Sequence, residues 1–245
     1  AKYTAQDFVE MIPELGSIAN IKAKSLMSAM SEDFAPSVWQ EMAQAVEKEL
    51  NSDVLGVVIS QGTDTLHFTT AALSFMLPEL NKPVIVTGAQ KSLDRGSSDA
   101  FMNLLCSVIA AAKFDGAEVV SCMHGTTSDD YCILNRGTKV RKMHSSARNA
   151  FKPINELPLA KVFPNDTLEV LNNNYRKRSD VKVKVDVKFE ERVAIIYVYP
   201  GLDPGIIDYY LSKGIKGIVI AGTGMGHVNT SGKFNLIPVL RKCND

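Results

Sequence analysis

The strongest constraint on the fold is a strand that runs into a glycine and is followed by a helix. Residues 57–60 are β-forming, Gly62 follows closely, and an apolar helix pattern covers 66–77. Parallel α/β folds bind ligands at such junctions, outside the carboxyl ends of their strands. The turn at Gly62 is therefore the first place to expect a ligand.

This strand–turn–helix unit recurs along the chain. Residues 84–87 predict a buried strand that ends at Gly88, and a helix pattern begins near Asp99. Residues 117–122 predict a third strand, and 36–50 an amphipathic helix with proline at its start. The alternation predicts an α/β fold with a large N-terminal parallel sheet and helices on both faces.

The pattern changes after residue 127. Short strands are expected over 131–134 and 138–140, as one hairpin, and 181–187 alternates apolar with charged residues like a half-exposed strand. Periodicity fades over 153–180, where prolines and three consecutive asparagines favour a surface excursion.

These patterns divide the chain into three parts. We predict an N-terminal catalytic domain over 1–160, a linker or excursion over 161–190, and a smaller C-terminal α/β domain over 191–245. The C-terminal part has a continuously apolar, buried strand pattern over 193–199, a helix pattern over 205–213 and another strand at 218–220.

Composition limits the class of protein. The 245 residues contain 27 Lys plus Arg and 27 Asp plus Glu, which argues against a broad nucleic-acid footprint. No apolar run is long enough for a membrane span, the four cysteines form no CxxC pair, and the four histidines have no metal-ligand spacing. We expect a cytoplasmic protein without a metal site or membrane contact.

The residues after Gly62 place a hydroxyl, a carboxylate and a second hydroxyl in succession, at Thr63, Asp64 and Thr65. Such residues also cap helices, so plain capping is an alternative interpretation. The basic stretch 136–142 has a similar alternative, because charged runs are often only a solvated face.

Several stretches together resemble one family. Residues 61–65 are similar to the HGTDT motif of the L-asparaginase and glutaminase superfamily, with Gln61 in place of histidine. Within the superfamily, the chain looks like the branch formed by the D subunits of archaeal glutamyl-tRNA(Gln) amidotransferases. The stretches that extend the resemblance are 86–90, 98–100, 129–132, 136–144, 150–155, 197–204 and 222–227.

The resemblance implies amide hydrolysis through an acyl-enzyme, with two threonines. One of them belongs to a Thr-Lys-Asp set, which the motifs place at Thr63, Lys142 and Asp64. A threonine hydroxyl is a weak nucleophile without a base, and a desolvated lysine can be that base. The same resemblance gives Asp64 a second role, holding the α-ammonium of the substrate.

Substrate binding is also implied for Ser31 and Glu32, which match a Ser-Gln/Glu pair of the family. Ser31 would donate to the α-carboxylate, and Glu32 would pair with the α-ammonium. The N–H groups near 62–65 and Ala89 are candidates for stabilising charge on the acyl oxygen.

The family's other threonine lies in a Gly-Gly-Thr turn after the first strand, and this sequence contains no such turn. We therefore expect a first strand and a nucleophilic threonine upstream of Ala1. We also expect the C-terminal domain to continue beyond Asp245.

The implied function is that of a glutaminase subunit, which hydrolyses L-glutamine to supply ammonia for converting Glu-tRNA(Gln) to Gln-tRNA(Gln). This chain would need no cofactor. ATP and Mg would be used by a partner E subunit, a kinase and transamidase that binds tRNA(Gln), and the chain would form a homodimer within a heterotetramer. The alternatives are a free-standing L-asparaginase that releases aspartate and ammonia, and a non-catalytic scaffold.

Overall fold

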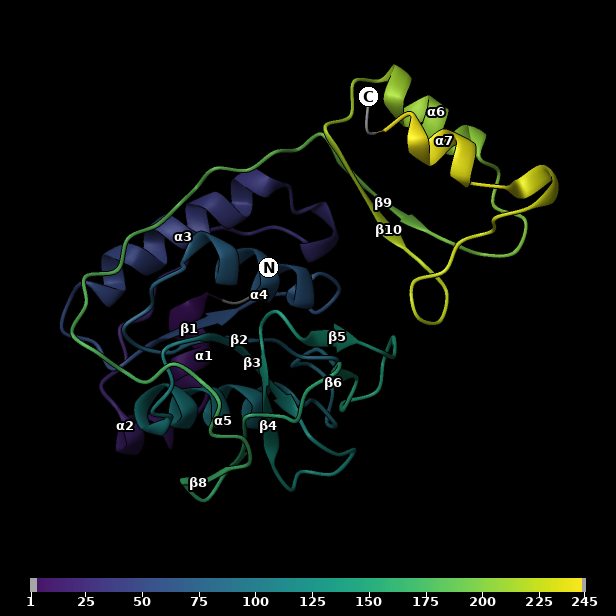
Figure 1. Cartoon of the computed structure of the whole chain (residues 1–245). Helices are drawn as coiled ribbons and strands as arrows, with labels where there is room; N and C mark the ends of the chain where they lie inside the picture. The colour runs from purple at the N-terminus through teal and green to yellow at the C-terminus, as the bar shows by residue number, and fades with distance from the viewer. Residues whose placement is uncertain (1–3, 244–245) are drawn as a thin grey trace. The chain divides into compact units, whose positions relative to one another are not determined.

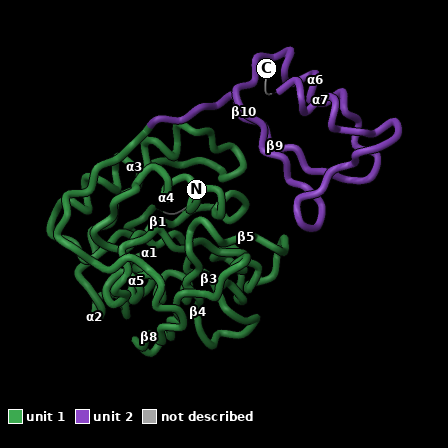
Figure 2. The backbone as a smooth tube through the Cα atoms, in the orientation of Figure 1, with its two compact units in different colours: residues 1–187 green, residues 188–245 purple. Residues whose placement is uncertain are grey.

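The computed structural model describes residues 4–243 and divides the chain into two compact units, residues 1–187 and 188–245 (Figure 2). Unit 1 holds a six-stranded sheet and unit 2 a two-stranded one. No helix in the described part of the chain is long and apolar enough to cross a membrane.

The large sheet of unit 1 has the strand order β1-β2-β3-β4-β7-β8 (Figure 1). Its first three strands are parallel, whereas the other three pair antiparallel. The predicted parallel sheet is thus a mixed sheet, because the chain turns back directly after β3 without a crossover helix. The strands are β1 (Val57–Ser60), β2 (Val84–Thr87), β3 (Val119–His124), β4 (Cys132–Arg136), β7 (Ala160–Phe163) and β8 (Thr167–Val170).

Helices cover both faces of this sheet, as predicted. On one face α3 (Pro36–Leu50) and α4 (Leu66–Met76) form a core with Val84 and Val86. On the other face α5 (Ala100–Lys113) packs against Ile85. Alternate strand residues point to opposite faces, so both cores are built from the same strands.

The segment before α3 is irregular. It contains the short helices α1 (Ala5–Glu10) and α2 (Leu15–Ile18) and a 3-10 turn η1 (Ser31–Asp33). Thr4 caps α1 in a capping box with Asp7. The turn η1 matters most here, because it brings Ser31 beneath the turn that follows β1.

The hairpin expected from 131–134 and 138–140 is not formed. β4 pairs with β3 and β7 in the large sheet, whereas β5 (Val140–Lys142) pairs with β6 (Phe151–Pro153) in a separate small sheet. Gly137 separates the two strands and packs against the backbone of Thr70 and Val119, where a side chain would clash. The chain therefore leaves the large sheet at this glycine.

The boundary between the units differs from the predicted one. Residues 161–190 were expected to form a linker, but β7 and β8 belong to the large sheet, and unit 1 continues to residue 187. Apolar residues that alternate along β7, such as Val162, are buried against α5, which explains their place in the fold.

The expected strand over 181–187 is an extended segment without a ladder. Val183 is buried and Val185 partly buried, so the alternation of apolar residues is real. Side chains replace a neighbouring strand: Asn51 bonds both the carbonyl and the N–H of Val183, and Glu47 accepts from the N–H of Val185. We call residues 181–187 the strap, because they run over α3 and α4 (Figure 1).

Unit 2 contains a parallel pair, β9 (Val193–Tyr197) and β10 (Gly217–Ala221), which confirms a second parallel sheet. The helices α6 (Gly205–Ser212) and α7 (Ile237–Arg241), with the 3-10 turn η2 (Gly232–Phe234), complete it. Burial alternates along β9, so the expectation of a continuously buried strand over 193–199 is wrong.

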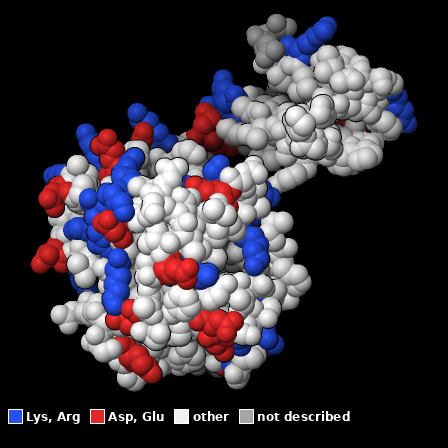
Figure 3. Space-filling view, turned by 60° about the horizontal axis from the view of Figure 1, so that its bottom comes forward, with Lys and Arg blue, Asp and Glu red and all other residues white. Residues whose placement is uncertain are grey.

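Charges are interspersed over unit 1. On the face that Figure 3 shows, basic and acidic side chains alternate across its surface rather than forming one field of a single sign. This distribution agrees with the balanced composition.

Candidate active site

The site lies where β1 and β2 end. Both strands are parallel, so their carboxyl ends meet at one edge of the sheet, and the N–H of Gln61 donates to the carbonyl of Thr87 at 3.0 Å. At the next position a Cβ on Gly88 would lie 2.4 Å from the carbonyl oxygen of Gln61 and 3.2 Å from Cγ2 of Thr63. Only glycine allows the two turns to approach this closely.

Three of the predicted site residues meet directly. Lys142 Nζ donates to Thr63 Oγ1 at 2.9 Å and to Asp64 Oδ1 at 2.7 Å. Thr63 is buried, the Lys142 side chain is 10% exposed, and the Asp64 side chain is 65% exposed. A buried hydroxyl and an exposed carboxylate thus share one cation, although Lys142 is 79 residues from Thr63 in sequence.

Thr65 is the N-cap residue of α4, but its side chain makes no capping hydrogen bond. Thr65 Oγ1 instead donates to the carbonyl of Ser31 at 2.8 Å, and Thr63 Oγ1 accepts from Lys142. The capping interpretation is therefore wrong, and the hydroxyls serve contacts far away in sequence.

Ser31 is also close to the turn. It is 2% exposed, and a Cβ on Gly62 would lie 2.7 Å from its Oγ. Glu32 follows in the same 3-10 turn with an exposed side chain. Ser31 thus lies beside the turn that carries Thr63 and Asp64, because it contacts Gly62 and Thr65. Glu32 extends from the same 3-10 turn into solvent.

His67 is the second residue of α4, and its ring centroid lies 4.3 Å from that of Phe68. Burial lowers the pKa of its imidazole, and the nearby charges of Arg141 and Lys142 lower it further. Among the residues that the structure describes, no cluster of His, Cys, Asp and Glu is arranged to hold a metal ion.

Comparison with known proteins identifies the family. The model for "Asparaginase, N-terminal" matches residues 1–176, and the model for "Glutaminase/Asparaginase C-terminal domain" matches residues 192–245. The chain belongs to the asparaginase family. The asparaginase-like two-domain α/β fold expected from the motifs is thereby confirmed.

The curated relatives of this asparaginase-family chain include archaeal proteins named as the D subunit of glutamyl-tRNA(Gln) amidotransferase. The protein from Pyrococcus horikoshii is 51% identical over 243 residues, which are 99% of this chain and 54% of that protein. The protein from Archaeoglobus fulgidus is 47% identical over 247 residues, covering 100% of this chain and 57% of that protein. The chain thus spans about half the length of the curated relatives it matches.

A solved structure is similar over most of the fold. The thermostable L-asparaginase from Thermococcus kodakarensis is 27% identical with a TM-score of 0.84, and the match covers 99% of this chain and 70% of that chain.

One group of residues near the asparaginase-family site was missed by the sequence patterns. Asn103 Nδ2 donates to the carbonyl of Gly88 at 2.8 Å, and Asp99 accepts from the N–H groups of Gln90 and Lys91. The spacing of Asp99 and Asn103 places both on one face at the start of α5, which is the signal that points to this contact.

Proposed function

We propose that the chain hydrolyses the side-chain amide of L-glutamine, as the glutaminase subunit of a tRNA-dependent amidotransferase. The ammonia would convert Glu-tRNA(Gln) to Gln-tRNA(Gln). The observation that carries the proposal is the contact of Lys142 with both Thr63 and Asp64. The similarity to proteins named as the D subunit of glutamyl-tRNA(Gln) amidotransferase supports the choice of reaction.

The proton chemistry centres on Lys142. In the structure its ammonium donates to Thr63 Oγ1 and is held by the Asp64 carboxylate. To act as a base toward Thr63, Lys142 must first give up a proton, and the buried hydroxyl is then the only proton donor it faces within this triad. We assign Thr63 the role of a catalytic proton relay: the neutral Lys142 amine takes the proton of Thr63 Oγ1, and Oγ1 takes one from the water that hydrolyses the acyl-enzyme.

Substrate capture follows from exposure. The outward-facing Asp64 carboxylate and the exposed Glu32 are suited to the α-ammonium of an amino acid. Ser31 is buried against the Gly62 turn, and its hydroxyl is assigned to the α-carboxylate from the resemblance to the family, not from exposure. These roles divide the site into a buried reacting end and a charged recognition end.

The remaining parts of the reaction are assigned to other groups. The family's Gly-Gly-Thr turn is not in this sequence, so the primary nucleophile is proposed to come from outside the present residues. ATP and Mg are assigned to a partner E subunit that binds tRNA(Gln), in a cytoplasmic complex built on a homodimer of this subunit. The interspersed surface charges suit a subunit that does not bind tRNA alone.

A free-standing L-asparaginase is the second candidate, which the similarity to the Thermococcus kodakarensis L-asparaginase favours. The deciding experiment measures ammonia release by the full-length protein from glutamine and from asparagine, with and without the partner and tRNA. Glutamine hydrolysis that increases with partner and tRNA supports the proposal. Fast asparagine hydrolysis, unaffected by tRNA, would instead identify the second candidate.

A further inference from the structure

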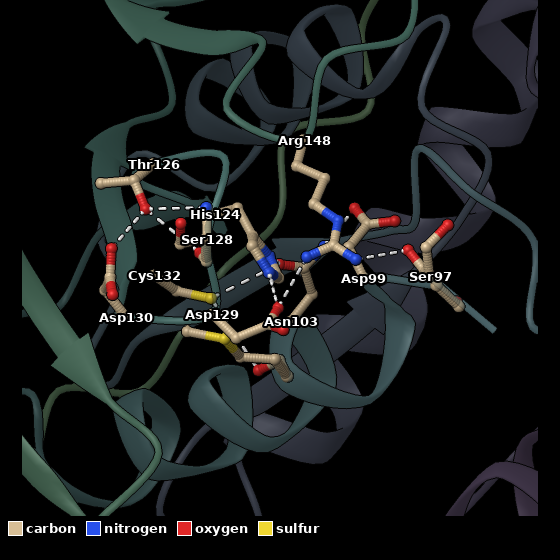
Figure 4. Close-up of polar contacts among 12 residues, drawn as sticks. Ser97, Asp99, Asn103, His124, Thr126, Ser128, Asp129, Asp130, Cys132 and Arg148 are labelled. Atoms are coloured by element: carbon tan, nitrogen blue, oxygen red, sulfur yellow. Dashed lines mark hydrogen bonds and ion pairs between the residues drawn. The ribbon is translucent and has the colours of Figure 1, made fainter.

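A network of buried polar side chains, labelled in Figure 4, contacts the turn at Gly88 through Asn103. Asp99, Asn103 and His124 each have no exposed surface. Asn103 Nδ2 donates to the Gly88 carbonyl at 2.8 Å and to Asp99 Oδ2 at 3.0 Å. A buried polar group without a partner is costly, so a network this deep in the fold has a fixed arrangement.

The two donor contacts fix the Asn103 amide. Because Nδ2 has two oxygen acceptors, Oδ1 must face His124, whose Nδ1 lies 2.6 Å away. An amide oxygen is only an acceptor. His124 Nδ1 therefore carries a hydrogen and donates it.

The other ring nitrogen faces an acceptor too. His124 Nε2 lies 3.0 Å from Asp129 Oδ1, which also accepts from Arg148 Nη1 at 2.8 Å. The hydrogen bond from His124 and the charge of Arg148 hold the pKa of Asp129 below its ordinary value. A carboxylate is only an acceptor, so Nε2 also carries a hydrogen, and the ring is an imidazolium.

The network reaches a second loop through Arg148. Arg148 Nη2 donates to the carbonyl of Ser97 at 2.6 Å, and Gln90 Nε2 donates to that of Ala147 at 2.9 Å. Both Ala147 and Arg148 belong to the loop 143–150, which begins directly after Lys142 and is closed by the bond from Met143 N–H to the Ala150 carbonyl. The same set of contacts thus touches the Gly88 turn and the loop that follows Lys142.

We propose that His124, held as an imidazolium, is a positioning residue that fixes the turn packed against Thr63 and the loop that follows Lys142. The inference rests on the proposed function for its catalytic consequence. The titratable and charged groups that face His124 or its partners are Asp99 on α5, Cys132 on β4, Asp129 after β3 and Arg148 in the loop 143–150.

The protonated ring is the form that satisfies both partners. A neutral His124 would leave one nitrogen lone pair against an acceptor, at either Asn103 Oδ1 or Asp129 Oδ1. The Asp129 carboxylate, whose pKa is lowered, stabilises the folded network at pH values above its ordinary pKa. This stabilisation is lost as the pH falls through the folded pKa of Asp129. Order around the site should therefore decrease as the pH falls through the folded pKa of Asp129.

Two adjacent carboxylates offer a matched pair of variants. Asp129→Asn removes the charge that faces His124, whereas Asp130→Asn makes the same change where the partner is Thr126 Oγ1. Nitrogen-15 spectra of the imidazoles in the full chain at neutral pH report the protonation of His124 directly. Two protonated nitrogens are expected in the parent and in Asp130→Asn, and one in Asp129→Asn. A single protonated nitrogen in the parent would overturn the inference.

A second readout does not depend on activity. The N–H groups of Gln90 and Lys91, which donate to Asp99, should exchange with solvent at least tenfold faster in Asp129→Asn than in Asp130→Asn. Equal exchange in the two variants would mean that His124 does not position this turn.

Turnover connects the inference to catalysis. With glutamine as substrate, Asp129→Asn should lower kcat about 10- to 100-fold, since small misplacements of reacting groups have effects of this size. Unchanged turnover alongside altered spectra would overturn positioning only, and a parent without glutaminase activity would overturn the proposed function only.

Discussion

The ion pair between Lys142 and Asp64 is asymmetric. The lysine is nearly buried, but the carboxylate is largely exposed, so water screens the pair and it contributes only about 0.2–1 kcal/mol to stability. A contact that contributes so little to the fold, yet lies beside a buried threonine, is better explained by a role in the site than by a structural role.

Replacing Lys142 should therefore affect activity much more than stability. In Lys142→Met the buried stem keeps its volume, but the proton acceptor for Thr63 is lost, and kcat should fall about 10²- to 10⁴-fold. The matched control is Lys139→Met, which changes an exposed lysine of the same segment. Glutamine turnover and thermal unfolding of both variants test this, and retained activity in Lys142→Met would exclude the relay.

His67 makes stability depend on pH. Its folded pKa is below the ordinary 6.5, mainly because of burial, so the unfolded chain binds the proton more readily. The free energy of unfolding should have its full value above pH 6.5 and decrease as the pH falls through the folded pKa. His67→Gln should flatten this slope. Urea titrations of the parent and the variant across this pH range test it, and an unchanged slope would contradict the role of His67.

At the scale of single elements, the geometry of the site depends on the close approach of the turn at Gly88 to the turn at Gln61–Thr63. Gly88→Ala would place a methyl group 2.4 Å from the backbone oxygen of Gln61, which cannot move without shifting Thr63. The expected cost is about 1–3 kcal/mol of folding free energy, accompanied by a loss of turnover. Gly96→Ala is the control, because no atom lies within 4 Å of the new methyl group. Urea unfolding and glutamine turnover of both variants test this prediction. A Gly88→Ala variant with unchanged stability and turnover would contradict the packing described.

Elements with a strong local pattern were predictable from sequence. The helix at 36–50 has the observed bounds, because its proline start and four-residue apolar spacing are local signals. The hairpin expected about 135–137 was wrong, since pairing partners are chosen by tertiary contacts such as those around Gly137. The presence of a strand could thus be predicted from its local sequence, whereas the strand with which it pairs could not.

The candidate site divides in the same way. Thr63, Asp64 and Lys142 could be assigned only through the motifs, and the roles given to them and to Ser31 and Glu32 stay predictions. The network around His124 was not recognised, because the spacing of Asp99 and Asn103 covers only part of it, and His124 and Arg148 come from separate segments. Such a set becomes visible only when the fold brings the segments together.

At the scale of the whole molecule, the strap is a long-range tie within unit 1. Asn51→Ala removes both hydrogen bonds to the backbone of Val183, which should cost about 1–3 kcal/mol at 0.5–1.5 kcal/mol each. The N–H groups of 181–187 should then exchange faster with solvent. Ser52→Ala is the control, because Ser52 Oγ bonds only within its own turn, to the carbonyl of Glu49. Hydrogen exchange by mass spectrometry resolves the two, and an unaffected strap would show that packing of Val183 alone holds it.

The strap also explains why the domain boundary was misplaced. Its alternating pattern, with exposed Lys182 and Lys184, predicts a strand, but nothing local shows that Asn51 and Glu47 hold its backbone against unit 1. Fading periodicity indicates the absence of regular structure, which is different from the absence of a fixed position.

The three buried cysteines have a practical consequence. Cys106 on α5 and Cys122 and Cys132 on the sheet share one core, and burial, together with hydrogen bonds to the other two thiols, raises the pKa of Cys132. A thiol that is both enclosed and protonated does not react with an alkylating reagent until the helix separates from the strands. The exposed Cys243 reacts at once and marks the start of the measurement. The rate at which the other three cysteines are alkylated therefore reports how often α5 separates from the sheet under native conditions, without an engineered probe.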